Sequence, residues 1–141
     1  MIWKSFLVSV FLTWPASGAW AQEAPKGNGC VKCHVDLDDD LATLWKDDVH
    51  AKAGIGCELC HGGNPNTDDA DRAMAKKAGF RGAPKRSEIP RFCGRCHSDA
   101  VFMKQYAPML PVDQLEKYWT SVHGKKIRGG DVKVAECVSC H

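Results

Sequence analysis

The sequence predicts a mostly α-helical domain in which long loops join short helices. Apolar residues recur at helical spacing in several short stretches of the 141-residue chain. Elsewhere, no convincing alternation of apolar and polar residues predicts a strand. Stretches that contain glycine and proline separate the helical ones, so we expect loops between them.

The clearest helix is expected over residues 38–50. Its apolar residues fall on one helical face: Leu41, Leu44, Trp45 and Val49. Asp38 or Asp39 is the expected N-cap, because a carboxylate there accepts from free backbone N–H groups. Gly54 and Gly56 should end the helical stretch before the second pair of cysteines.

Shorter features flank this helix. Residues 22–29 are expected to be a flexible lead-in, and Gly-Gly-Asn-Pro at 62–65 predicts a turn. Thr67 is the expected cap of a short helix that runs through Ala78 and ends at Gly79.

The second half of the chain predicts two more helices. After a loop over 79–86, Ser87 should cap a helix that carries the third pair of cysteines. Pro111 stands where a first-turn proline belongs, so we expect a helix from there to His123 with Gly124 as its stop. Residues 124–136 are expected to form a loop or a short strand.

The first 21 residues have the pattern of an export signal. Lys4 precedes an apolar run over 6–14, and Ala-Trp-Ala at 19–21 is the small-x-small pattern that signal peptidase cuts. The run is shorter than the roughly 20 residues that span a bilayer. We therefore expect a signal peptide at 1–21, a mature domain at 22–141, a periplasmic, secreted or cell-surface location, and no stable membrane span after cleavage. An uncleaved N-terminal anchor is the alternative.

The mature domain is short of core-forming side chains. Leu, Ile, Val and Phe make up 21 of its 120 residues, below the roughly 20% typical of chains that bury a core. The net charge without residues 1–21 is only +1, from 18 basic and 17 acidic side chains, so the chain is not a disordered polyelectrolyte. Something other than side chains must fill the core. Nucleic-acid binding is not expected of an exported chain.

All eight cysteines occur as C-x-x-C pairs, and a histidine follows each pair. The cysteines are Cys30, Cys33, Cys57, Cys60, Cys93, Cys96, Cys137 and Cys140, and the histidines are His34, His61, His97 and His141. C-x-x-C-H is the attachment signature of c-type haem. Two thiols bond the vinyl groups of the porphyrin, and the next imidazole binds its iron. The sequence therefore predicts four covalent haem c groups, and a small multihaem cytochrome c fold organised around them.

Eight cysteines also have two other common uses. Four disulfides suit an exported domain, and two Cys₄ zinc sites would use the same pairs. Neither explains why a histidine follows every second cysteine. Four porphyrins would also supply the apolar volume that the side chains lack, so we expect the chain without haem to be unfolded.

Four irons have eight axial positions, and the motif histidines fill four of them. His50 and His123 are the remaining histidines, each near the end of an expected helix with a tryptophan about one turn earlier. We expect both to be distal iron ligands, although the sequence does not say of which haem. For the other two positions the candidates are a methionine, an open iron, or ligands beyond His141 in a longer chain. The mature methionines are Met74, Met103 and Met109, each more typical of packing against porphyrin.

The chain resembles the tetrahaem and larger c-type cytochromes of anaerobic respiration and nitrogen metabolism. The resemblance covers nearly all of 30–141 and is carried by Cys93-Gly-Arg-Cys96-His97-Ser-Asp, Tyr118-Trp-Thr-Ser-Val-His123-Gly-Lys and Cys137-Val-Ser-Cys140-His141. It implies that the four motif histidines are proximal ligands and that His123 is distal; the context of His50 is more loosely similar. Many such relatives continue with further haem motifs, so we expect this sequence to be the front of a longer one. It has no C-x-x-C-K motif, unlike the ammonia-forming nitrite reductases, and no spanning helix of the membrane quinol dehydrogenases.

These features favour an electron carrier that exchanges electrons with redox protein partners. The alternative is an oxidoreductase that acts on a small nitrogen or sulfur compound at an open haem iron, and a third hypothesis is a subunit of a larger multihaem assembly. A basic stretch could steer an acidic partner, or could balance haem propionates or be merely solvated. Its members are Arg72, Lys76, Lys77, Arg81, Lys85, Arg86, Arg91 and Arg95. The aspartates around 36–48 could likewise form a docking face or a solvated one.

Overall fold

A computed structural model describes residues 28–141; the expected signal peptide at 1–21 and most of the expected lead-in lie outside the described residues. The α-helices are α1 (Gly29–Asp36), α2 (Asp40–Asp47), α3 (Val49–Lys52), α4 (Cys57–His61), α5 (Ala70–Ala73), α6 (Ile89–His97), α7 (Ala100–Tyr106), α8 (Gln114–Thr120) and α9 (Val122–Arg128). Three 3₁₀ turns complete the set: η1 (Lys76–Ala78), η2 (Arg86–Glu88) and η3 (Cys137–Ser139). The described part of the chain has no strand, which confirms the mostly α fold with long loops.

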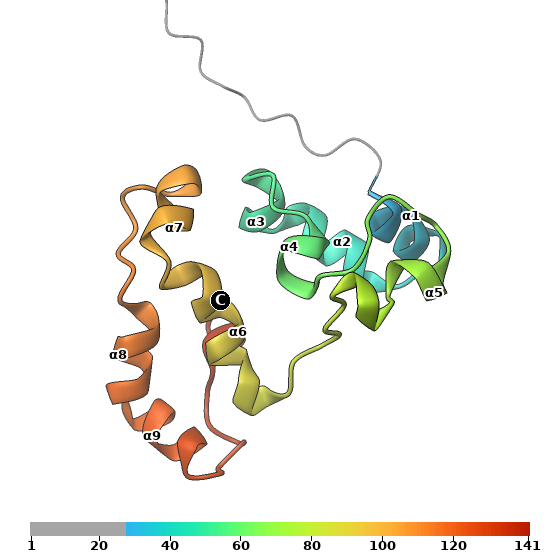
Figure 1. Cartoon of the computed structure of the whole chain (residues 1–141). Coiled ribbons are helices and arrows are strands. Elements are labelled where there is room, and N and C mark those ends of the chain that lie inside the picture. Colours follow the sequence, from blue (N-terminus) through green and yellow to red (C-terminus); the bar gives the residue numbers. More distant parts are fainter. Residues whose placement is uncertain (1–27) are drawn as a thin grey trace, which may run out of the picture.

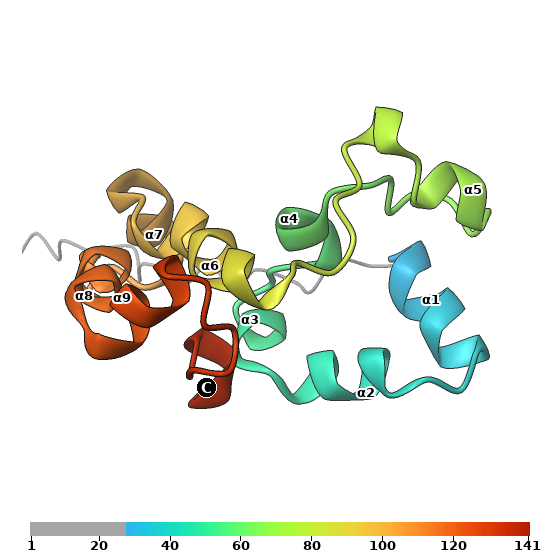
Figure 2. The same ribbon diagram turned by 90° about the horizontal axis from the view of Figure 1, so that it is seen from below.

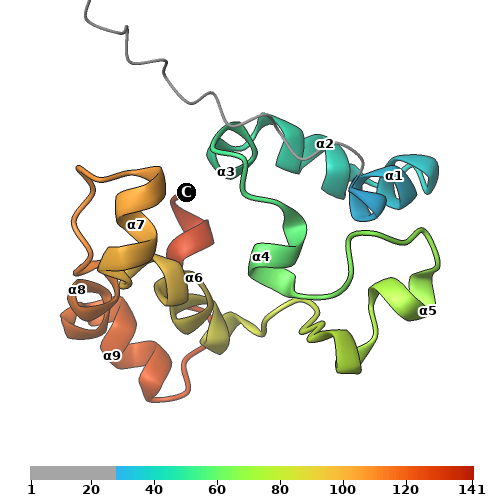
Figure 3. The same cartoon turned by 45° about the horizontal axis from the view of Figure 1, so that its top comes forward.

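The helices form two lobes joined by one crossing segment. Figure 1 shows α1 to α5 on one side and α6 to α9 on the other. We call residues 28–80 the N-terminal lobe and residues 86–141 the C-terminal lobe. In Figures 2 and 3 a single extended stretch leads from the N-terminal lobe into α6. The chain ends close to α6, because η3 packs against that helix.

Backbone hydrogen bonds between turns hold the N-terminal lobe together. The N–H of Gly29 donates to the carbonyl of Pro65 at 2.8 Å, and the N–H of Asn64 donates to Ala73 at 2.9 Å. Ala42 and Ile55 are the apolar residues buried in this lobe. Most of its aliphatic side chains stay exposed: Val35, Leu37, Leu41, Leu44, Val49 and Leu59.

Side-chain packing holds the C-terminal lobe together. Helix α8 packs on both α6 and α9, and Met103 and Ile127 are buried at 5% and 4% exposure. Gly94 lets α8 approach α6, because a Cβ there would lie 2.6 Å from Leu115. This lobe therefore has a small core of its own.

The helix expected over 38–50 is two helices in the structure. Asp39, one of the two predicted N-caps, is the N-cap of the first helix, and its carboxylate accepts from the N–H of Leu41. The helix ends at Asp48, whose extended backbone (φ −71°, ψ 153°) interrupts it, and α3 begins at Val49. The single-helix prediction was wrong because Asp48 caps a new helix instead of continuing the old one.

The helix expected from Pro111 to His123 is also wrong in its bounds. It begins later, at Gln114, and breaks at Ser121, after which α9 runs to Arg128. Gly124 is not a stop: it lies buried within α9, where a Cβ would fall 2.0 Å from the Tyr118 carbonyl. The expected loop or strand over 124–136 is therefore helical at its start.

The sequence predicted two helix caps at the wrong residues and several turns at the right ones. Asp69 caps α5 in place of Thr67, and the stretch to Ala78 is broken into α5 and η1. Ser87 lies within η2 and caps nothing, although the third cysteine pair does lie on a helix, α6. Gly79 ends η1 with the left-handed backbone (φ 78°) expected of a stop. The chain also turns at Gly54 and Gly62, as predicted.

Candidate functional site

Each of the four C-x-x-C-H motifs lies on a helical turn. The first is in α1, the second forms α4, the third ends α6, and the fourth begins in η3. In an α-helix, residues three and four apart share a face, so both cysteines and the histidine of a motif are presented together. The local fold therefore suits two thioether bonds and one axial bond to a single porphyrin.

The structure does not support the two other uses of the cysteines. All eight are free thiols, so the four-disulfide alternative is not formed. Within residues 28–141, no group of three or more His, Cys, Asp or Glu side chains is placed to hold a metal ion. Free, paired thiols are the form that haem attachment requires.

Successive motifs are neighbours in space. Burial and then the proximity of Cys30 raise the pKa of the Cys57 thiol, and burial and then Cys96 raise the pKa of the Cys60 thiol. Burial and the adjacent Cys137, to which it donates a hydrogen bond, raise the pKa of Cys93 to about 12. These pairs place motif one beside two, two beside three, and three beside four.

Two motif histidines have one ring nitrogen fixed by the protein. His34 Nδ1 lies 2.5 Å from an Asp39 carboxylate oxygen, and His61 Nδ1 lies 2.9 Å from the carbonyl of Gly82. A hydrogen bond at Nδ1 orients the ring and leaves Nε2 as the nitrogen for a metal. Sequence reasoning expected Asp39 only as a helix cap and missed its contact with the His34 ring, whose only signal was an aspartate five positions after a motif histidine.

The remaining motif histidines are His97 and His141, and they lie near each other. His97 is partly buried, and burial, followed by the neighbouring His50 and His141, lowers its pKa. This favours the neutral imidazole, which is the form that binds iron. His141 is exposed and close enough to His97 to contribute to that shift.

His50 and His123 occupy the same local structure in the two lobes. Asp48 and Ser121 each interrupt a helix and cap the next, and each histidine is the second residue of that next helix. His50 Nδ1 lies 2.6 Å from Asp48, and its ring lies 6.0 Å from that of His97, centroid to centroid. His123 is exposed, and among residues 28–141 no ring contact joins it to a motif histidine. The structure thus brings His50, but not His123, to a motif histidine.

The methionines differ in burial. Met103 is a core residue of the C-terminal lobe at 5% exposure, in agreement with a packing role. Met74 and Met109 are exposed, at 47% and 92%.

Part of the basic stretch forms a pocket beside the second and third motifs. The pocket is about 340 Å³ and is lined by Arg81, Gly82, Pro84, Glu88, Arg91, Phe92 and Arg95. Two of these guanidinium groups also donate to the carbonyl of Cys60, Arg95 at 2.7 Å and Arg81 at 3.2 Å. Guanidinium groups bind carboxylates well, so this pocket suits haem propionates. Phe92 also packs on the ring of His61, with centroids 5.2 Å apart.

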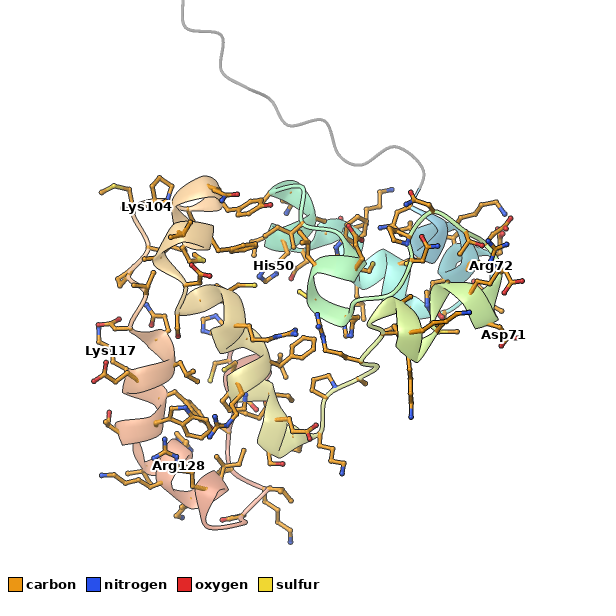
Figure 4. The ribbon with its side chains drawn as sticks, in the orientation of Figure 1. His50, Asp71, Arg72, Lys104, Lys117 and Arg128 are labelled. Carbon is orange, nitrogen blue, oxygen red and sulfur yellow. The ribbon has the colours of Figure 1, made fainter. Side chains whose placement is uncertain are left out.

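The residues present fit covalently bound haem. The thiols are free and paired, His34, His50 and His61 have a protein-bound Nδ1, and the N-terminal lobe exposes aliphatic side chains around its two motifs. Figure 4 shows His50 on the side of α3 that faces the C-terminal lobe. Bound haem supplies one-electron chemistry at its iron, while the protein holds and orients it.

Comparisons with known proteins agree with this fit. The family model described as "Cytochrome c554 and c-prime" matches residues 15–62, which include the first two motifs. The curated C-type polyheme cytochrome OmcC of Geobacter sulfurreducens is 25% identical over 117 residues. That match covers 79% of this chain and 14% of the relative, so the chain spans a small part of that protein's length. No solved structure matches the chain.

Within residues 28–141, no helix is both long and apolar enough to cross a membrane. The chain is thus similar, over these stretches, to c-type cytochromes that carry several haems.

Proposed function

We propose that this chain carries four covalent haem c groups and relays electrons among them, outside the cytoplasm, between redox protein partners. Each C-x-x-C pair attaches one haem, and the histidine after it is the proximal iron ligand; His50 and His123 are distal ligands. Residues 1–21 direct export and are removed, which leaves 22–141 as the haem-bearing domain.

The observation that carries the proposal is that consecutive motifs lie near one another in space. The neighbouring thiols are Cys30 and Cys57, Cys60 and Cys96, and Cys93 and Cys137. Each pair joins consecutive motifs, so haems on them would follow one another in chain order. A relay needs closely spaced redox groups, whereas an enzyme site needs one exposed iron with substrate-binding groups around it. The proximity of consecutive motifs therefore favours a relay.

The protein's part in the relay is to hold the haems and to set their electrostatic surroundings. Arg81 and Arg95 donate to the carbonyl of Cys60, which connects the second motif to the crossing segment and to α6. The carboxylates of Asp39 and Asp48 increase the basicity of the imidazoles they bind, which tunes the iron potentials. Three arginines near the second and third motifs stabilise ionised propionates.

Removing a middle or a terminal haem tests the relay. The double variant Cys57→Ala, Cys60→Ala loses the second haem, and Cys137→Ala, Cys140→Ala loses the fourth. Both are expected to accept three electrons per chain in a reductive titration, against four for the unaltered protein. Removal of the second haem should slow electron exchange between the first and third, measured by flash photolysis, while removal of the fourth should leave it unchanged.

Two results would overturn the proposal. The unaltered protein could accept fewer than four electrons per chain, which would contradict the haem count. Alternatively, the second-haem variant could exchange electrons between its first and third haems as fast as the fourth-haem variant does, which would contradict the order of the relay.

A further inference from the structure

His50 is held in a fixed orientation by a single carboxylate. Asp48 Oδ1 accepts from the backbone N–H of His50 at 2.7 Å and lies 2.6 Å from its ring Nδ1. The carbonyl of His50 in turn accepts from Ile55 at 2.8 Å, and the carbonyl of Ile55 accepts from the indole of Trp45 at 3.1 Å. With Nδ1 engaged, Nε2 is the nitrogen available to a metal.

The ring that faces His50 belongs to the other lobe. His97, at the end of α6, has its ring centroid 6.0 Å from that of His50, and the two ring planes are 85° apart. Metal–imidazole bonds are about 2 Å long. Two such bonds on opposite sides of one metal, with the added distance from each nitrogen to its ring centre, separate the centroids by about 6 Å. The observed separation therefore leaves room for one iron between the two imidazoles.

We propose that His50 is the distal ligand of the haem attached to Cys93 and Cys96, opposite the proximal His97. This inference rests on the proposed attachment of haem to the third motif. Among the described residues, the ring of His50 contacts that of His97 and not those of His34 or His61. His141, which also influences His97, belongs to the fourth motif and is the proximal ligand there.

The assignment has a structural consequence. His50 lies on α3 in the N-terminal lobe and His97 on α6 in the C-terminal lobe. The third haem is thus bound covalently to one lobe and through its iron to the other. It also has six ligands and no site for substrate, and its near-perpendicular ring planes predict a strongly anisotropic low-spin signal in the ferric EPR spectrum.

The test uses the full chain with its haems attached. In His50→Ala, one haem per chain should lose its low-spin ferric EPR signal and become high-spin, and it should bind carbon monoxide when reduced. Imidazole added to His50→Gly should restore the low-spin signal, which shows that the variant is folded. His123→Ala is the matched control, since it removes the equivalent histidine of the C-terminal lobe and should leave the strongly anisotropic signal intact.

A second measurement identifies the haem without any variant. In paramagnetic NMR spectra of the unaltered protein, ring protons of His50 should show nuclear Overhauser effects to the haem that also shows them to Cys93 and Cys96. Effects to another haem would overturn the assignment, as would an unchanged low-spin signal in His50→Ala. Haem stoichiometry separates the two proposals: four haems per chain with either of these results refutes the ligand assignment alone, whereas fewer than four refutes the proposed function.

Discussion

The two lobes carry two motifs each, but they are stabilised differently. In the C-terminal lobe, α8 packs on both α6 and α9, Met103 and Ile127 are buried, and the Arg86–Glu136 ion pair (2.9 Å) joins η2 to the segment before η3. In the N-terminal lobe the connections are mainly backbone hydrogen bonds between turns, and six of its aliphatic side chains remain 41–70% exposed. The same kind of haem motif therefore lies on two scaffolds with different amounts of packing.

The shortage of core-forming residues leaves many aliphatic side chains of the N-terminal lobe exposed. Exposed side chains such as Leu37 and Leu44, at 70% and 68%, gain nothing from the polypeptide around them. Their burial against porphyrin would contribute about 25 cal/mol for each Å² of apolar surface removed from water. The C-terminal lobe also exposes aliphatic side chains, such as Val101 and Val122 at 73% and 67%, but its helix α8 packs on both α6 and α9. We therefore expect the N-terminal lobe to depend on haem for its fold more than the C-terminal lobe does.

Loss of haem should have the largest effect, and it should be unequal between the lobes. A chain in which all eight cysteines are replaced by alanine is expected to lose its helices over 29–61, because backbone turns alone do not stabilise such short helices. Residues 89–128 should keep part of their helix content. Circular dichroism with limited proteolysis, mapped by mass spectrometry, distinguishes the lobes.

Variants that remove one pair at a time sharpen this comparison. Cys30→Ala with Cys33→Ala should expose the N-terminal lobe to protease, and Cys137→Ala with Cys140→Ala should leave α6 to α9 protected. Native helix content in the eight-alanine chain, or equal protease sensitivity of both lobes, would contradict the account.

Among the glycines of the described residues, Gly62 and Gly124 allow the closest backbone approach, one in each lobe. A Cβ at Gly124 would lie 2.0 Å from the carbonyl oxygen of Tyr118, and one at Gly62 would lie 2.0 Å from that of Gly79. Gly62 also has positive φ (69°). Alanine at either position should cost on the order of 2–4 kcal/mol in the free energy of unfolding, measured by denaturant titration.

Gly129→Ala is the matched control for these variants. A Cβ there meets nothing closer than 3.3 Å, and its φ of −77° suits any residue. Its free energy of unfolding should change by less than about 0.5 kcal/mol. If Gly124→Ala were equally mild, the tight junction between α8 and α9 would not exist as described.

The next effect concerns the buried carboxylate of the C-terminal lobe. Glu136 is 3% exposed and pairs with Arg86, which also donates to the carbonyls of Val132 and Val134. Arg86→Ala leaves this charge buried without its partner. Because Arg86 itself is half exposed, the cost should be about 2 kcal/mol of unfolding free energy, lower than for a fully buried pair.

The exposed pair Lys117–Asp113, at 2.8 Å, supplies the comparison for Arg86. Lys117→Ala should change the free energy of unfolding by less than about 0.5 kcal/mol. Adding Glu136→Gln to Arg86→Ala should recover part of the loss, since the unpaired charge is gone. An Arg86→Ala variant as stable as Lys117→Ala would show that the pair does not stabilise the lobe.

The sequence predicted the helical class, the haem motifs and Asp39 as a cap, because each depends on short-range chemistry. It did not predict the helix breaks at Asp48 and Ser121. Apolar spacing runs through both positions, so periodicity alone predicts one helix where a polar side chain caps a second. The sequence also could not predict the contact of His50 with His97, because this contact depends on how the two lobes pack.

The smallest expected effect is acid sensitivity of the histidine-binding carboxylates. The ring of His34 lowers the pKa of Asp39, and the backbone N–H of His50, followed by its ring, lowers the pKa of Asp48. A lowered pKa stabilises the fold above the ordinary aspartate value of about 3.9, and this contribution is lost as pH falls through the lowered value. Asp48→Asn should therefore flatten the acid-unfolding curve below about pH 4, followed by circular dichroism. Asp71→Asn, at an exposed position, should leave the curve unchanged; equal curves for Asp48→Asn and the unaltered protein would contradict this role.

The intact mass of the mature, haem-loaded protein tests the central claim most directly. The account predicts residues 22–141 with four covalently attached haems, or a longer chain that contains this domain with all four of its motifs occupied. Peptide mapping by mass spectrometry assigns each haem to its cysteine pair. A mature protein in which any of the four cysteine pairs is left without haem would contradict the account.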